Sequence, residues 1–334
     1  MATKKSNNTL LVDGNALFKT AYYGAKRLMY NNEKIGGIYL TLSIIRKLIN
    51  ENKINKIVVV WDGENSIGPR ALLYPWYKEN RLRDMTPDEE DNYHFQKSRV
   101  KQYLEELFIR QHITEDCEAD DAIAYYTQNK IHNENVIVVT NDRDLLQLLD
   151  ERTSVYLIDK KEIINQNNFR IFFPYHYKNV KVIKILTGDR SDNIHGIRGL
   201  ACDEGIERVI GIIPEICQRE ITLDEVFESC EKNKDQQICK NILTGKSARG
   251  IFGKEFFDIN EKIINLDNPL IDDKNKSAMD VLIKEKMDPT DRRFKNLLKM
   301  MIKDGTIQLI PGKNERWEEF VQPFIKIVRH EKHD

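Results

Sequence analysis

The sequence lacks the hallmarks of several protein classes. Its 334 residues contain no apolar run long enough to span a membrane, and the basic stretch 1–9 lacks the apolar core of a signal peptide. The five cysteines are scattered without a C-x-x-C pair, which argues against a disulfide framework or a zinc site and favours reduced thiols. We therefore expect a cytoplasmic protein of a bacterial cell or a virus-infected host, with no membrane association.

An excess of charge of either sign is also missing, since 52 Lys and Arg residues balance 53 Asp and Glu residues. This balance does not exclude a nucleic-acid partner, because a carboxylate cluster that binds cations leaves the remaining surface net basic. The chain length and the apolar fraction of 40% suit one large or two modest domains with an ample core.

The most informative stretch spans residues 118–149. It contains five carboxylates: Glu118, Asp120, Asp121, Asp142 and Asp144. The first three begin a predicted helix, and the last two follow the apolar run 136–139, which is typical of a strand buried on both faces. Five acids at one place would repel one another unless cations lay between them. The stretch therefore predicts a divalent-metal site.

Two other apolar runs also end in an aspartate followed by a glycine. Residues 9–12 precede Asp13, and residues 57–61 precede Asp62. Strands that alternate with helices form a parallel sheet, and the carboxyl ends of its strands share one edge. We therefore expect Asp13 and Asp62 to join the five carboxylates there. The alternative is that both aspartates belong to ordinary solvated turns after strands.

Two more carboxylates, Asp189 and Asp192, stand three residues apart in a predicted loop or first helical turn and could complete the metal site. A turn with two glycines, Gly196 and Gly199, follows before another predicted helix. A helix, a glycine turn and a second helix form a helix-hairpin-helix arrangement, in which turn amides face a phosphate without reading bases. We therefore predict that both glycines contact the substrate.

The segment 70–99 interleaves aromatic residues with cations. Such residues can stack on bases and hold phosphates, and the alternative is a solvated helix with ion pairs. Lys78 and Arg81 would share one helix face. The acidic run 88–91 is expected to be a solvated part of this excursion, and residues 96–111 are expected to form an amphipathic helix that returns to the core.

Taken in order, these motifs resemble the 5′-nuclease or flap endonuclease superfamily, and within it the bacterial and bacteriophage members. The matching sequences are LLVDGNAL, VVVWDG followed by LYPWYKENR, EADDAIA, VIVVTNDRDLLQLL and GDRSDNIHGIRGL. The resemblance implies a PIN-like α/β fold, with a mainly parallel central sheet flanked by helices, a helix-hairpin-helix motif and a helical C-terminal region. It also implies a nuclease core over 1–185 with a short arch at about 70–100, a helical region over 186–270 and an extension over 271–334.

The resemblance implies a structure-specific 5′-nuclease, with 5′-3′ exonuclease and flap endonuclease activity on branched or 5′-ended DNA in replication and repair. RNA primers in RNA/DNA hybrids are a further implied substrate. Lys78 and Arg81 would be catalytic, and Tyr77 and Arg70 would contact the substrate. Two or more Mg²⁺ or Mn²⁺ ions are expected, because oxygen ligands suit these hard cations. The implied metal ligands are Asp13, Asp62, Glu118, Asp120, Asp121, Asp142, Asp144, Asp189 and Asp192.

The hairpin departs from the family pattern. Ala201 replaces the second glycine, and Asp203 and Glu204 stand where a lysine and a threonine are usual. Acids beside a phosphate repel it, which leaves open how this turn anchors a duplex and whether it holds the monovalent cation that the resemblance suggests. We expect a monomer, with a sliding clamp and a single-strand-binding protein as candidate replication partners.

Three other functions fit parts of the sequence. A phosphatase with an aspartyl nucleophile commonly needs a second aspartate two residues after the first, where this chain has Asn15. A catalytically weak DNA-junction-binding protein would be expected to have lost carboxylates, and this chain keeps them. A PIN-type ribonuclease would generally lack the hairpin that follows Asp192.

Overall fold

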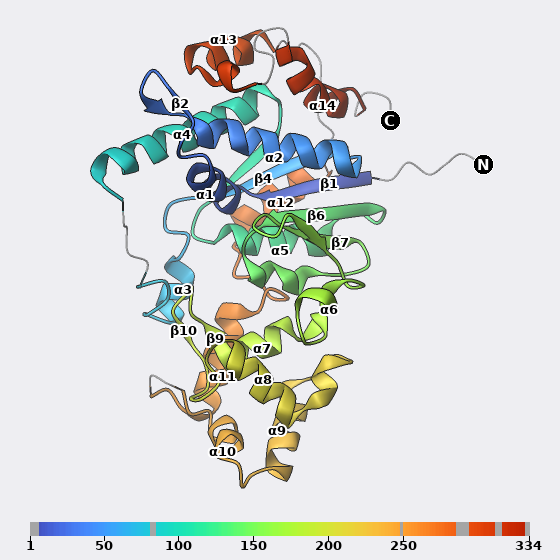
Figure 1. Ribbon diagram of the computed structural model, residues 1–334. Helices are drawn as coiled ribbons and strands as arrows, with labels where there is room; N and C mark the ends of the chain where they lie inside the picture. Colours follow the sequence, from blue (N-terminus) through green and yellow to red (C-terminus); the bar gives the residue numbers. More distant parts are fainter. Residues whose placement is uncertain (1–6, 81–84, 248–249, 285–293, 311–315, 331–334) are drawn as a thin grey trace, which may run out of the picture.

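The computed structural model describes residues 7–80, 85–247, 250–284, 294–310 and 316–330. Within these residues, six strands form one sheet in the order β5-β4-β1-β6-β7-β8, and all neighbours are parallel except β7 and β8. Figure 1 shows this sheet at the centre of the molecule. The strands are β1 (Asn7–Asp13), β4 (Lys56–Asp62), β5 (Arg110–Thr114), β6 (Glu134–Thr140), β7 (Thr153–Leu157) and β8 (Glu162–Ile164). The predicted α/β fold with a mainly parallel sheet is confirmed.

The middle residues of the central strands are apolar because helices cover both faces of the sheet. In β1, Leu10 and Val12 belong to the core on one face, and Leu11 belongs to the core on the other. The first face is covered by α1 (Gly14–Gly24), α2 (Gly36–Asn52), α4 (Pro87–Glu106), α13 (Lys295–Lys303) and α14 (Trp317–His330). The second face is covered by α5 (Ala119–Asn129) and α12 (Asp273–Lys284), and the same core includes residues of α7 (Val180–Thr187) and α11 (Gly253–Ile264).

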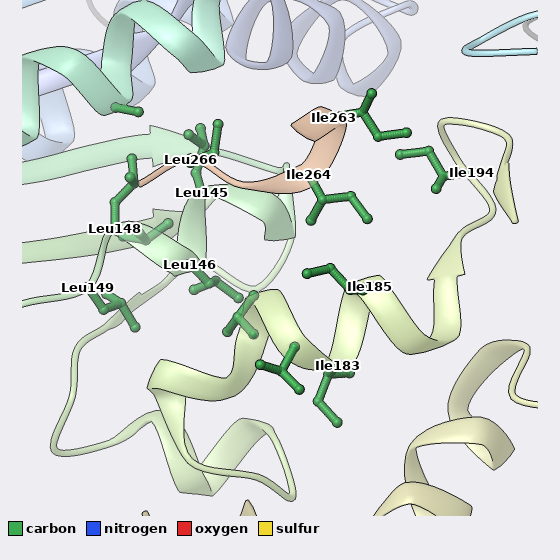
Figure 2. Packing of buried hydrophobic residues seen from close by; sticks show 14 of the residues in the cluster. Leu145, Leu146, Leu148, Leu149, Ile183, Ile185, Ile194, Ile263, Ile264 and Leu266 are labelled. Carbon is green, nitrogen blue, oxygen red and sulfur yellow. The ribbon is translucent and has the colours of Figure 1, made fainter. Parts of the chain in front are cut away.

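The core on the second face continues beyond the sheet. The 3₁₀ helix η1 (Arg143–Leu148) follows β6, and its leucines lie beside Ile183 and Ile185 of α7 and the end of α11, as Figure 2 shows. The same cluster reaches Met279 of α12. The boundaries predicted at residues 185 and 270 therefore lie within a shared core.

The helix predicted over 96–111 has other bounds. The acidic run 88–91 lies at its N-terminal end, where Asp88 and Asp91 are exposed, as expected of a solvated segment. Helix α4 begins at Pro87, after Thr86, whose side chain accepts a hydrogen bond from the backbone N–H of Glu89. The acidic run forms the first helical turn, where negative charge is favourable next to the helix N-terminus. Residues 110–114 form the edge strand β5, whose sequence RQHIT has too few apolar residues to predict a buried strand.

The remaining elements extend away from the sheet. A short hairpin of β9 (Gly188–Asp189) and β10 (Ile194–His195) separates α7 from α8 (Cys202–Ile212), with α9 (Leu223–Lys232) and α10 (Gln237–Leu243) beyond, at the bottom of Figure 1. No described helix is long and apolar enough to cross a bilayer. The other short elements are β2 (Met29–Tyr30), β3 (Glu33–Lys34), α3 (Gly68–Leu73), α6 (Phe169–Phe172), η2 (Tyr177–Asn179), η3 (Pro214–Cys217) and η4 (Thr306–Leu309).

Candidate metal centre

Three neighbouring strands deliver aspartates to one edge of the sheet. Asp13 ends β1, Asp62 ends β4 and Asp142 follows β6, and β1 lies between the other two strands. Asp13 is fixed by two donors, since Ala16 N–H donates to its Oδ1 and Thr140 Oγ1 donates to its Oδ2, each at 2.9 Å. The predicted convergence of strand ends at a single edge is therefore present in the structure.

Helix α5 brings two more carboxylates to this edge. Glu118 is its N-cap residue and Asp120 lies in its first turn. The backbone N–H of Ala119 donates to Asp62 Oδ1 at 2.7 Å, so the start of α5 is tied directly to the end of β4. An acid in the first helical turn is also stabilised by the helix dipole.

The pKa values show that these acids are close enough to oppose one another's ionisation. Burial, with the charges of Asp62 and Asp142, raises the pKa of Asp13 to about 7. Burial also raises the pKa of Asp120, and the charges of Asp142, Asp13 and Glu118 raise it further. The pKa of Asp142 is likewise raised, mainly by burial. A bound cation would relieve this repulsion.

Lys78 supplies one positive charge from within the chain. Its ammonium donates to the Glu118 carboxylate and lies 3.6 Å from Asp192 Oδ2. Lys78 has a left-handed backbone, with φ +56°, and its N–H donates to the carbonyl of Asp192 at 2.9 Å. Asp192 thus holds the strained residue through both its backbone and its side chain.

Tyr77 lies inside the protein. Its hydroxyl donates to Glu118 Oε2 at 2.6 Å and lies 3.0 Å from Asp192 Oδ2. Burial and the nearby carboxylates raise the pKa of Tyr77, which keeps the phenol protonated as a donor. With 5% of its surface exposed, the ring is not presented for stacking on a base in this structure. It instead joins α5 to the β9–β10 hairpin.

Lys184 supplies a second internal charge, and the sequence reasoning missed it. Its ammonium pairs with Asp144 from η1 and with Asp189 from β9. Burial opposes ionisation of Asp189, but Lys184 and the Ser191 donors outweigh it and lower the pKa of Asp189 to about 2. The available signal was a lysine between Ile183 and Ile185 of α7, five residues before Asp189.

Arg70 and Asp121 form a buried ion pair beneath the centre. The guanidinium donates to both oxygens of Asp121, at 2.5 and 2.9 Å, and lies 3.1 Å from Glu118 Oε2. Arg70 Nε donates to the carbonyl of Ile263, and Asp121 Oδ1 also accepts from the N–H of Leu270. Arg70 is 4% exposed and Asp121 is fully buried. The structure therefore buries both residues away from solvent.

The predicted residues thus divide into groups. The structure gathers eight of the nine predicted ligands around Lys78 and Lys184: Asp13, Asp62, Glu118, Asp120, Asp142, Asp144, Asp189 and Asp192. The predicted catalytic residue Arg81 lies outside the described residues. Gly196 and Gly199 lie in the turn after β10, which ends at His195.

The donor chemistry of this edge fits a hard divalent cation. All eight side chains offer carboxylate oxygens, and Asn15 Oδ1 is buried beside them without a hydrogen-bond donor in the described chain. As they stand, no three Asp, Glu, His or Cys side chains of the described residues form a group that could hold an ion. In this arrangement Lys78 lies between Glu118 and Asp192, and Lys184 lies between Asp144 and Asp189.

The chain is similar in sequence to known 5′-3′ exonucleases. The model of the 5′-3′ exonuclease, N-terminal resolvase-like domain, matches residues 8–173. A 5′-3′ exonuclease of Mycoplasmopsis pulmonis is 27% identical over 296 residues, which cover 87% of this chain and 93% of that protein. A 5′-3′ exonuclease of Mycoplasma pneumoniae is 30% identical over 254 residues, which cover 72% of this chain and 80% of that protein.

A solved structure shares the fold. The flap endonuclease of bacteriophage T5, in complex with DNA and metal ions, superimposes with a TM-score of 0.62. The alignment covers 97% of this chain and 100% of that one at 17% sequence identity. At this identity the likeness concerns the arrangement of helices and strands, including the helical C-terminal region.

Proposed function

Because the chain belongs to the family of 5′-3′ exonucleases, we propose that it cleaves branched or 5′-ended DNA duplexes at the carboxylate edge of its sheet. It is a metal-dependent phosphodiester hydrolase. The proposed cofactors are two or more Mg²⁺ or Mn²⁺ ions. RNA primers in RNA/DNA hybrids are a second proposed substrate class. We still predict a monomer that has a sliding clamp and a single-strand-binding protein as partners.

One observation carries this proposal. Eight carboxylates from separate segments meet at one edge, where neighbouring charges and burial raise the pKa values of Asp13 and Asp120 and where Lys78 and Lys184 are inserted among the acids. These eight side chains would hold the ions, which would activate water for attack on the phosphodiester and stabilise the leaving 3′ oxygen. Asp121 has both oxygens on Arg70, so we assign it to positioning rather than to metal binding.

The chain's own cations have distinct parts in this proposal. Lys78 Nζ lies between Glu118 and Asp192, within reach of a phosphate that is held next to these carboxylates. An ammonium at this place would stabilise negative charge that develops on the phosphate oxygens. Arg70 and Tyr77 both contact Oε2 of Glu118 from below, so they would orient this carboxylate without touching DNA. Arg81 would add a second cation beside Lys78.

The duplex would extend from this edge toward the turn 196–199 at the start of α8. Turn amides and a helix N-terminus can hold a phosphate without reading sequence. A contact there, at a distance from the carboxylates, would fix which phosphodiester reaches them. Gly196 and Gly199 are therefore proposed substrate contacts, although Asp203 and Glu204 in the first turn of α8 would oppose a phosphate.

The test uses a 5′-end-labelled flap duplex and its counterpart with an RNA flap strand, incubated with Mg²⁺, Mn²⁺ or EDTA. Metal-dependent cleavage near the junction is expected, and the ratio of the two rates identifies the preferred substrate. Tight binding of the flap duplex without cleavage in any metal arm, by a protein that metal still stabilises against heat, would instead identify a junction-binding protein.

A further inference from the structure

The turn 196–199 is where the family resemblance suggests a bound monovalent cation. Peptide carbonyls hold such a cation in place of its hydration shell. The site must therefore offer carbonyl oxygens that do not already face a positive charge of the chain. The hydrogen bonds of this turn can be followed residue by residue.

Three successive carbonyls of the turn accept donors from the chain. Ile197 O accepts from the N–H of Leu200 at 2.9 Å. Arg198 O accepts from Asn241 Nδ2 at 2.9 Å. Gly199 O accepts from Arg208 Nη1 at 2.6 Å. The last donor is a guanidinium, so the carbonyl of Gly199 already faces a full positive charge.

The position of Arg208 follows from the local backbone. Arg208 lies on α8, and Gly199 has φ +93°, which turns its carbonyl toward this helix. Residue 205 is a glycine because a Cβ there would lie 1.9 Å from the carbonyl oxygen of Leu200. This close packing of α8 on the turn brings the Arg208 side chain within reach of Gly199.

The turn is also fixed from its other side. Arg198 N–H donates to the carbonyl of Lys246 at 2.8 Å, and Ile197 bridges to Ser247. Asn241, which bonds to Arg198 O, is 7% exposed. The segment after α10 therefore holds the turn in its shape through backbone bonds that need no ion.

A monovalent cation does not fit this turn, because a guanidinium occupies its terminal carbonyl and would repel a second positive charge. We infer that Arg208 takes the place of the monovalent cation, so the hairpin anchors duplex DNA without a bound K⁺ or Na⁺. Half of the Arg208 side chain is exposed, which leaves donors for a phosphate. Its guanidinium also lies 4.0 Å from Glu204 and offsets part of the acidity there. This inference rests on the proposed function, since it concerns how the same substrate is held.

The test is the affinity for a flap duplex in EDTA, measured in KCl, NaCl and tetramethylammonium chloride at equal ionic strength. Equal ionic strength is needed because phosphate contacts weaken with salt whatever the cation. The wild type should bind with the same Kd, within about twofold, in all three salts. Arg208→Gln should bind about tenfold more weakly in tetramethylammonium, because a charge-assisted contact is lost, and K⁺ should restore part of the affinity by reaching the vacated carbonyl.

Arg219→Gln is the matched control, because Arg219 is an exposed arginine that pairs with Glu225 away from the turn. It should bind like the wild type. A wild type that binds tightly in KCl but at least tenfold more weakly in tetramethylammonium chloride would overturn the inference and leave the nuclease proposal intact. Loss of both binding and metal-dependent cleavage in every salt would overturn the proposed function, and this inference with it.

Discussion

The ammonium group of Lys184 pairs with the carboxylate of Asp189, which follows it by five residues, and it also contacts Asp144. The helix α7 thus contributes a positive charge to an edge that is otherwise lined by acids. A divalent ion that binds Asp144 and Asp189 must compete with this lysine. Lys184 therefore links the stability of the metal-free protein to its affinity for metal.

Removal of Lys184 should lower the stability of the metal-free protein and raise its affinity for metal. We expect Lys184→Met to lower the unfolding temperature of the metal-free protein, because two buried carboxylates lose their counter-charge. The Mn²⁺ concentration that gives half of the maximal thermal stabilisation should fall about threefold to tenfold, since the competing charge is gone. Lys181→Met is the control, because Lys181 lies on the same helix but pairs with the exposed Asp267. Equal Mn²⁺ midpoints for Lys184→Met and the wild type would contradict this account.

Asp142→Asn should abolish cleavage and keep the fold. The asparagine retains an oxygen that can accept the Asp144 N–H, as Asp142 Oδ1 does at 2.8 Å. It removes one negative charge from the repelling group, so the rate on a flap duplex should fall about 100-fold or more, while the unfolding temperature stays at or above that of the wild type. The exposed Asp159→Asn serves as the control for the substitution. Retained cleavage would remove Asp142 from the set of ligands.

The buried pair of Arg70 and Asp121 should behave as a structural unit. Because both side chains are buried, Asp121→Asn leaves a guanidinium without its counter-charge and should lower the free energy of unfolding by about 3–5 kcal/mol. Urea unfolding measures this loss. Arg70→Met combined with Asp121→Leu should recover part of it, since no buried charge remains. If Asp121→Asn were as stable as the wild type but had lost metal binding, Asp121 would be a ligand after all.

Asp150 should give a measurable pH dependence of stability. Burial raises its pKa, but donors from Lys130, Arg152 and Thr153 outweigh burial and lower it. A lowered native pKa stabilises the fold above the unfolded value of about 3.9, and this contribution disappears as the pH falls through the native pKa.

Asp150→Asn should therefore unfold at a slightly lower temperature than the wild type at neutral pH, and the difference should shrink as the pH falls below about 4. The difference is small because half of the Asp150 side chain is exposed and screened by solvent. Glu151→Gln, at the neighbouring exposed position, controls for the loss of one charge. A difference that grows toward acid pH would have the wrong sign for this mechanism.

The sequence predicted the sheet edge because its signals are local. An apolar run that leads to Asp13, Asp62 or Asp142 predicts both a strand and the acid at its end. Parallel pairing of the strands then brings these ends to the same edge of the sheet. Strand β5 gave no such signal, since an edge strand with one face toward polar surroundings needs few apolar residues. Helix α4 was placed too late because the acids of its first turn were taken as a solvated excursion, although Thr86 and Pro87 form a good helix start.

The contacts between the predicted residues were not predictable in the same way. Arg70 meets Asp121 across 51 positions and Tyr77 meets Asp192 across 115, so no spacing rule relates them. The aromatic and cationic residues of the segment 70–78 were expected to face substrate. Whether such a residue points inward depends on the side chains of α5 and the β9–β10 hairpin that it can contact. Burial of a charged side chain is decided by its partner, which the sequence does not reveal.

The central claim is that the carboxylate edge is a divalent-metal centre. The most direct measurement is Mn²⁺ uptake by the DNA-free protein, followed by electron paramagnetic resonance for the wild type and Asp142→Asn. The wild type should remove about two ions per chain from solution, and the variant should remove fewer, with a weaker affinity. Identical uptake by the two proteins, or none by the wild type, would contradict the claim.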